Sequence, residues 1–114
     1  IAHATVTTAH DLNATAIITV TKAGATARLI SKYRPEMPII SCTTDEHIRR
    51  QMNMSWGVTP IVIAEKTNSD ELFMEAAEAA KKAGFVHSGD TVVLTAGVPL
   101  GVSGTTNLMR VEIK

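Results

Sequence analysis

The stretch "AIITVTKAGATARLISKYRP", residues 16–35, decides the fold because a strand, a tight corner and a helix follow one another within it. The run at 16–20 is continuously apolar and rich in β-branched residues, which is typical of a strand covered on both faces. A helical pattern follows over about 24–33, and Pro35 ends it because proline disfavours helical geometry at the preceding residue. A buried strand that passes directly into a helix predicts a parallel sheet coated by helices.

The same alternation continues on both sides of this stretch. Apolar residues at helical spacing predict a first helix over about 2–12, with Asn13 as its stop. Further apolar runs predict strands at 38–42, 58–64 and 90–97. The chain therefore alternates strand and helix along most of its length.

Two more helices are predicted between these strands. Thr43 and Glu46 have the spacing of a capping box for a helix over about 44–53. Ser69 is the expected cap of the longest helix, and Gly84 lies beyond its end. The residues of this last helix that share an apolar stripe, and are predicted to be buried, are Phe73, Ala76, Ala77, Ala80 and Ala83.

These elements predict one three-layer α/β/α domain over residues 1–114, with a five-stranded, mostly parallel sheet. The final segment, "LMRVEIK" at 108–114, alternates strictly between apolar and charged residues, as a half-exposed edge strand does. The connection before it has about 11 residues, which is short for a parallel crossover and favours antiparallel pairing with the fourth strand. Pro60 favours an edge for the third strand. The expected strand order is 3-2-1-4-5.

Composition and charge exclude several classes of protein. Lysine plus arginine and aspartate plus glutamate each number 11, so no overall field gathers nucleic acid or an anionic membrane. No apolar run approaches the roughly 20 residues that span a bilayer. Cys42 is the single cysteine, and its apolar surroundings favour a buried thiol over a reactive one. We expect a cytoplasmic protein, and the absence of an initiator methionine favours a piece of a longer chain.

The candidate site follows from the expected strand order. Ligands of open α/β sheets bind at the carboxyl ends of strands, where neighbouring connections leave in opposite directions, here between the first and fourth strands. One loop at this point runs into a helix start, whose free amides and positive dipole end favour a phosphate. It consists of Thr21, Lys22, Ala23, Gly24, Ala25 and Thr26. The other, "GVPLGVSGTTN" at 97–107, has the backbone freedom to fold over a sugar phosphate, and its candidate residues are Gly97, Gly101, Val102, Ser103, Gly104 and Thr105.

Plainer interpretations of these residues stay open. The hydroxyls can cap helices, and the glycines can simply make turns. Trp56 can stack on a ligand or pack, and taken alone packing is favoured. Arg49 and Arg50 indicate a solvated helix face, and Ser88 has no partner pattern for nucleophilic catalysis. No metal-ligand spacing is present among His3, His10, His47 and His87. The sequence predicts neither a catalytic residue nor a metal site.

Three pieces of the chain nevertheless resemble the C-terminal domain of bacterial-type pyruvate kinases. They are "TKAGATARLISKYRPEMPII" at 21–40, "MSWGVTPIVIAE" at 54–65 and "SGDTVVLTAGVPLGVSGTTNLMRVEIK" at 88–114. The pieces "ARLISKYRP" and "GVSGTTN" are the most specific, and the resemblance covers nearly the whole chain. It implies a five-stranded mixed sheet with helices on both faces.

The resemblance also implies that regulation and catalysis belong to different domains. In that family this domain is regulatory, whereas phosphate transfer from phosphoenolpyruvate to ADP, with magnesium and often potassium, belongs to a separate barrel domain. The fragment alone is then expected to be inactive and to hold no cofactor. The family's effector site uses the loop matching 21–26 to hold a phosphate of a sugar bisphosphate or a monophosphate, under a closing loop matching 97–106.

Two departures from the family bear on the effector. Ala23 and Ala25 stand where many relatives carry polar residues that can donate to phosphate. Trp56 stands where relatives that respond to fructose 1,6-bisphosphate often have an arginine for the second phosphate, and an indole cannot replace that charge-assisted contact. The resemblance therefore favours a sugar or nucleotide monophosphate, such as ribose 5-phosphate or AMP.

The family assembles as a tetramer, with this domain at one interface. The strand at 108–114 could pair with its twin across a two-fold axis, or its charges could protect the edge from such pairing. The leading hypothesis is an effector-binding regulatory domain that contacts the barrel of its own chain. The alternatives are a purely structural assembly domain and a stand-alone small α/β enzyme or phosphate-ligand binder.

Overall fold

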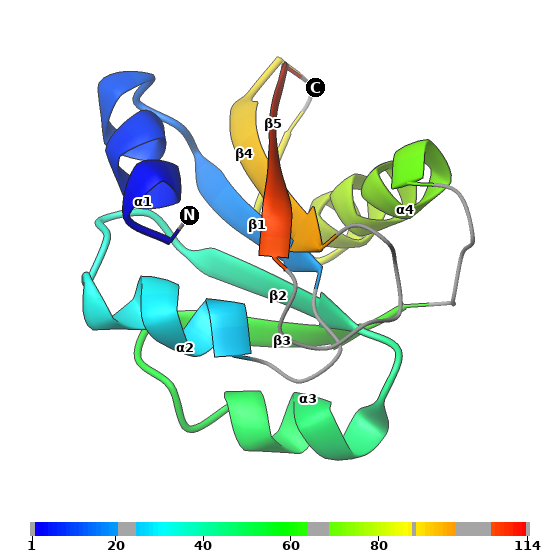
Figure 1. Cartoon of the computed structure of the whole chain (residues 1–114). Coiled ribbons are helices and arrows are strands. Elements are labelled where there is room, and N and C mark those ends of the chain that lie inside the picture. Colours follow the sequence, from blue (N-terminus) through cyan, green and yellow to red (C-terminus); the bar gives the residue numbers. More distant parts are fainter. Residues whose placement is uncertain (1, 21–24, 64–68, 88, 98–105, 114) are drawn as a thin grey trace.

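The structure, a computed structural model, describes residues 2–20, 25–63, 69–87, 89–97 and 106–113 of the chain. Strands and helices alternate along it (Figure 1). In chain order the elements are α1 (Ala2–Asp11), β1 (Ala16–Val20), α2 (Ala25–Lys32), β2 (Ile39–Thr43), α3 (Glu46–Met52), β3 (Val58–Val62), α4 (Ser69–Lys82), β4 (Thr91–Gly97) and β5 (Thr106–Ile113).

The strands form one sheet of five, in the order β3-β2-β1-β4-β5. Strand β1 lies between β2 and β4 and is parallel to both, and β3 is parallel to β2. Strand β5 is antiparallel to β4 and forms the other edge. The predicted α/β fold, with a parallel sheet of four strands, is confirmed.

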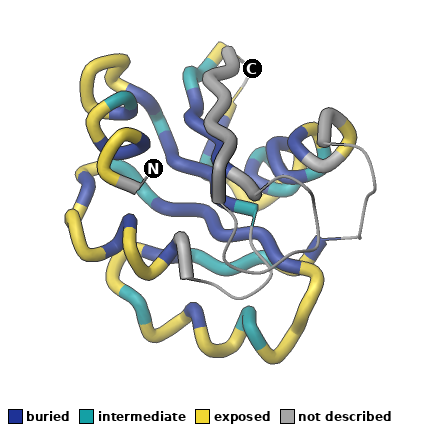
Figure 2. Tube along the Cα trace, viewed as in Figure 1, coloured by how far each residue is buried: buried dark blue, intermediate teal, exposed yellow. Residues whose placement is uncertain are grey.

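Each face of the sheet carries its own hydrophobic core, because successive residues of a strand point to opposite faces. On one face Ile17 of β1 packs with residues of α1, α2 and α3, such as Ile30 and Met52. On the other face Ile18 packs with Phe73 and other residues of α4. Strands β1, β2 and β4, in the middle of the sheet, are buried over most of the length whose burial is described (Figure 2). The result is a three-layer arrangement: among the described helices, α4 covers one face and α1, α2 and α3 cover the other.

The ends of α1 and α4 show why these two helices stop where the sequence predicts. Asn13 adopts φ +54°, its amide donates to the carbonyl of His10, and the amide of Ala14 donates to the carbonyl of Ala9 at 2.9 Å. Gly84 adopts φ +87° and the same pair of bonds closes α4, where the amide of Phe85 reaches the carbonyl of Ala80. Both ends are Schellman motifs, which satisfy carbonyls that the last turn leaves free.

Two predictions about helix starts were wrong in detail. Asp45, not Thr43, caps α3, because its carboxylate accepts from the amides of His47 and Ile48, at 2.8 and 3.4 Å. Thr43 is the last residue of β2. Ser69 is the first helical residue of α4, so it does not precede the helix as a cap.

The buried stripe of α4 is one residue shorter than predicted. Phe73, Ala76, Ala77 and Ala80 are buried, but Ala83 is exposed because it lies beyond the last helical residue, Lys82.

Candidate functional site

The candidate site lies where the helical connections change face. Helix α2, after β1, covers one face of the sheet, and α4, before β4, covers the other. The two strands are neighbours and end together, with Val20 opposite Ala96. Helix α2 begins at Ala25, five residues after Val20. The start of α2 and the end of β4 therefore lie at the same edge of the sheet, which we call the carboxyl edge.

The structure brings three of the predicted site residues to this edge. Ala25 and Thr26 are the first two residues of α2, and Gly97 is the last residue of β4. The remaining predicted residues of the two loops lie outside the described part of the chain: Thr21, Lys22, Ala23, Gly24, Gly101, Val102, Ser103, Gly104 and Thr105.

The start of α2 suits an anion. The first amides of a helix have no intrahelical acceptor, and the aligned peptide dipoles place roughly half a positive charge there. No acidic residue lies in the first turn of α2 to offset this charge. The edge can therefore hold a phosphate by backbone donors.

A row of buried hydroxyls lies on neighbouring strands next to the carboxyl edge. Thr19 of β1 is opposite Ser41 of β2 and opposite Thr95 of β4, and all three side chains are fully buried. Thr19 Oγ1 donates to Ser41 Oγ at 3.0 Å, and Ser41 Oγ donates to Met52 Sδ at 2.8 Å. Sequence analysis missed this row because three polar residues on separate strands become neighbours only through the register.

Trp56 does not lie near these residues. It precedes β3, which starts at Val58, so it belongs to the opposite, amino-terminal edge of the parallel strands. Its carbonyl oxygen accepts from Ser31 Oγ at 2.6 Å, in the last turn of α2, and Arg34 Cζ lies 5.2 Å from the centre of its ring. A five-residue strand such as β1 separates the two edges by about 16 Å. The structure therefore does not bring Trp56 together with Ala25, Thr26 and Gly97.

Cys42 and the arginines of α3 have the structural roles that the sequence favours. Burial, helped by the charge of Glu75, raises the pKa of the Cys42 thiol to about 12, so the thiol is neutral at pH 7. Arg49 pairs with Glu46 on the exposed side of α3, and this partner holds the pKa of the Glu46 carboxyl below its usual range. Neither group contributes a reactive centre.

Three of the described histidines make local contacts. The His3 ring stacks on Tyr33 with centroids 5.4 Å apart, and His47 Nε2 lies 3.2 Å from Gln51 Nε2. The backbone amide of His87 donates to the carboxylate of Asp90. Within the described ranges, no three histidine, cysteine, aspartate or glutamate side chains gather as metal ligands would.

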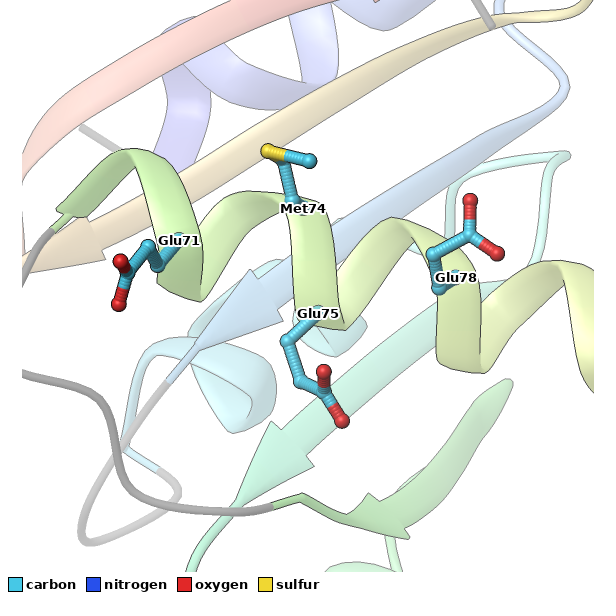
Figure 3. A pocket seen from close by; sticks show the side chains of 4 residues that line it. All are labelled: Glu71, Met74, Glu75 and Glu78. Atoms are coloured by element: carbon cyan, nitrogen blue, oxygen red, sulfur yellow. The ribbon is translucent and has the colours of Figure 1, made fainter.

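A shallow pocket of about 310 Å³ lies on the outer side of α4 (Figure 3). Its lining residues are Glu71, Met74, Glu75 and Glu78. Three carboxylates on one helix face repel a phosphate, so this pocket and the carboxyl edge differ in the ligands they favour. In the part of the chain that is described, no helix has both the length and the apolar character to cross a bilayer.

These observations define a doubly wound α/β domain with an anion-favouring helix start at its switch point. The sequence profile of the family described as "Pyruvate kinase, alpha/beta domain" matches residues 1–112. The chain belongs to this family.

Individual relatives agree with that assignment. Pyruvate kinase of Lactobacillus delbrueckii subsp. bulgaricus is 49% identical over 113 residues, which cover 99% of this chain and 19% of the relative. Pyruvate kinase of Clostridium acetobutylicum is 50% identical over 109 residues, or 96% of this chain and 23% of the relative. Among solved structures, Cryptosporidium parvum pyruvate kinase in complex with ADP superposes with a TM-score of 0.88 and 39% identity. That match covers 99% of this chain and 23% of the other, so the chain spans about a fifth of the length of its relatives.

Proposed function

We propose that this domain is the regulatory and assembly domain of a cytoplasmic pyruvate kinase and binds a phosphorylated effector at the carboxyl edge. The observation that carries the proposal is the start of α2, which has no acidic residue in its first turn and lies at the same edge of the sheet as the end of β4. The favoured effector is a sugar or nucleotide monophosphate, held by residues 21–26 and covered by residues 97–105. Trp56 is left out of the site because it lies at the opposite edge.

The chemistry of the whole protein is proposed from its family. Phosphate transfer from phosphoenolpyruvate to ADP takes place in a separate barrel domain of the same chain, which uses magnesium and often potassium. This domain supplies no catalytic residue and no cofactor, and it is inactive alone. Its part is to bind the effector, and the binding energy biases the arrangement of domains and subunits.

Helix α2 offers a route for this coupling. It has eight residues and is therefore about 12 Å long, and it runs from the candidate phosphate position to the amino-terminal edge. Near its far end Ser31 is bonded to the carbonyl of Trp56, and Tyr33, just beyond it, stacks on His3. A phosphate that shifts the first turn of α2 also acts on these contacts, because a short helix moves as a unit.

Assembly is proposed at the other side of the sheet. Strand β5 is an edge strand, paired on one side with β4 through residues 91–97. An edge strand offers backbone groups to a second copy of the chain, and closed two-fold pairing is the commonest arrangement of homo-oligomers. A purely structural domain remains the rival, and it predicts an assembly whose sedimentation does not respond to sugar phosphates.

Binding of ribose 5-phosphate, AMP and fructose 1,6-bisphosphate to the complete protein, measured by calorimetry, tests the effector site. We expect a monophosphate to bind, and Thr26→Glu to weaken it at least tenfold, because a carboxylate at the start of α2 repels phosphate. Thr7→Glu is the matched control, since it adds the same charge at an exposed position of α1. If none of the three compounds binds, the site has no such function. If Thr7→Glu weakens binding as much as Thr26→Glu, the site lies elsewhere.

A further inference from the structure

The sheet has two edge strands, and β3 differs from β5 in what it offers to a further strand (Figure 1). In the described part of the chain, no strand pairs with the outer side of β3. The segment "VTPIVI" at 58–63 contains no charged residue, and every residue in it except Pro60 is β-branched. Strand β5, in contrast, includes Arg110 and Glu112. A short, uncharged, β-branched segment at a sheet edge is prone to pair with other chains.

Two hydrogen bonds fix which backbone groups of β3 face outward. The carbonyl of Gly57 accepts from the amide of Ile39 at 3.0 Å, and the amide of Ile63 donates to the carbonyl of Thr43 at 2.9 Å. Gly57 and Ile63 therefore direct these backbone groups toward β2. The backbone groups of successive residues in a strand point to opposite sides of the strand, so the even-numbered residues of β3 direct theirs to the open edge. These residues are Val58, Pro60 and Val62.

Pro60 is the central one of these three outward residues. It has no N–H, and its ring occupies the place where that hydrogen would lie, so a carbonyl of a further strand cannot bond there. The amide of Val58 already donates to the carbonyl of Ser55 at 3.4 Å. Val62 is 42% exposed, and it is the outward residue whose amide can still meet an approaching strand. A ladder with one such donor lacks the regular series of bonds from which strand pairs are built.

We propose that Pro60 closes the β3 edge to a second copy of the chain and so restricts strand pairing between copies to the β5 edge. This inference rests on the proposed function, in which copies assemble through β5, and adds the residue that decides between the two edges. A domain that pairs through one edge forms a closed two-fold pair, whereas a domain that pairs through both edges can extend without limit. Pro60 therefore keeps the assembly closed.

Pro60→Val in the complete protein tests this role, because valine restores the outward N–H in an uncharged, β-branched strand. We expect sedimentation velocity to show species of at least twice the wild-type mass, in a fraction that grows with protein concentration. Amide exchange over residues 58–63, followed by mass spectrometry, should become slower, because pairing protects the outward amides. Pro60→Thr should associate in the same way, since the restored N–H and not the side chain opens the edge.

Thr59→Val is the matched control. It makes β3 more apolar, but its amide faces β2, so sedimentation and exchange should stay as in the wild type. Wild-type sedimentation of both Pro60 variants would overturn the role of Pro60, and so would equal association of Thr59→Val, since apolar character would then be the cause. Loss of the folded domain in both Pro60 variants would also overturn it, because Pro60 would then be needed for the fold itself. A wild type that sediments as a monomer would overturn the proposed assembly at β5, while association of Pro60→Val would still support the closing of β3.

Discussion

At the scale of single residues, Cys42 shows how the sheet controls the chemistry of a side chain. The thiol is fully buried in β2, and the pKa is raised from 9.0 to about 12, first by burial and then by the charge of Glu75. A thiolate is the nucleophile in thiol chemistry, so the native protein should be inert at neutral pH. We expect a maleimide to label Cys42 in denaturant and not in the native protein at pH 8, as measured by mass spectrometry. Labelling at equal rates in both conditions would contradict the burial.

The Cys42 thiol also makes the stability of the domain depend on pH. Because the pKa of the folded state lies above that of the unfolded state, the contribution of the neutral thiol is complete below pH 9 and is lost as the pH rises toward 12. Each pH unit within that window lowers the free energy of unfolding by about 1.4 kcal/mol. We expect urea unfolding between pH 9 and 11 to show this slope in the wild type. The slope should be smaller in Cys42→Ala, and an equal slope in the two proteins would assign it to another group.

Single residues also mark the limit of sequence analysis. The apolar run around Cys42 predicts its burial, because neighbours in sequence decide it. The position of Thr95 beside Thr19 could not be predicted in that way. It depends on the register of β1 and β4, which neighbours in sequence do not reveal.

At the scale of elements, α3 tests the choice between two caps. The spacing of Thr43 and Glu46 matches a capping box, but Asp45 occupies the position where a side chain can reach the first free amides. Asp45→Ala should therefore weaken α3 by about 1 kcal/mol, the usual cost of losing an N-cap. We expect amide exchange in α3, followed by mass spectrometry, to become about fivefold faster.

Glu46→Ala is the control for that prediction. It removes the exposed pair with Arg49 and keeps the cap at Asp45, so exchange in α3 should remain close to wild type. If Glu46→Ala instead accelerates exchange as much as Asp45→Ala does, the capping box is the correct description of the helix start, because alanine cannot accept the amide hydrogen bond that a capping box needs. The sequence predicted the helix from its apolar period but not its cap, because three adjacent residues all have capping side chains.

At the scale of the whole molecule, the alternation of buried strands and helices was enough to predict an α/β domain with a parallel sheet. The apolar runs of β1, β2 and β4 can be recognised in the sequence because these strands are covered on both faces, and the helical period can be recognised because each helix is covered on one side. The placement of ligand-binding residues depends on direction as well. A residue after a parallel strand and a residue before one lie at opposite edges. Trp56 precedes the strand predicted at 58–64, so the sequence already separated it from the loop at 21–26, and its place as a site residue rested on the resemblance.

Trp56 therefore provides a test of the whole arrangement. If the effector binds at the carboxyl edge, Trp56→Phe should leave the affinity for ribose 5-phosphate within about twofold of the wild type, because a strand length of about 16 Å separates the ring from the ligand. The bond from Ser31 is retained in this variant, since its acceptor is the backbone carbonyl of residue 56. Calorimetry on the complete protein, with Thr26→Glu measured beside it, gives the comparison. A tenfold loss in Trp56→Phe would place the ligand at the amino-terminal edge, where Arg34 is the nearby cation, and the anion would then be bound by that side chain and not by the start of α2.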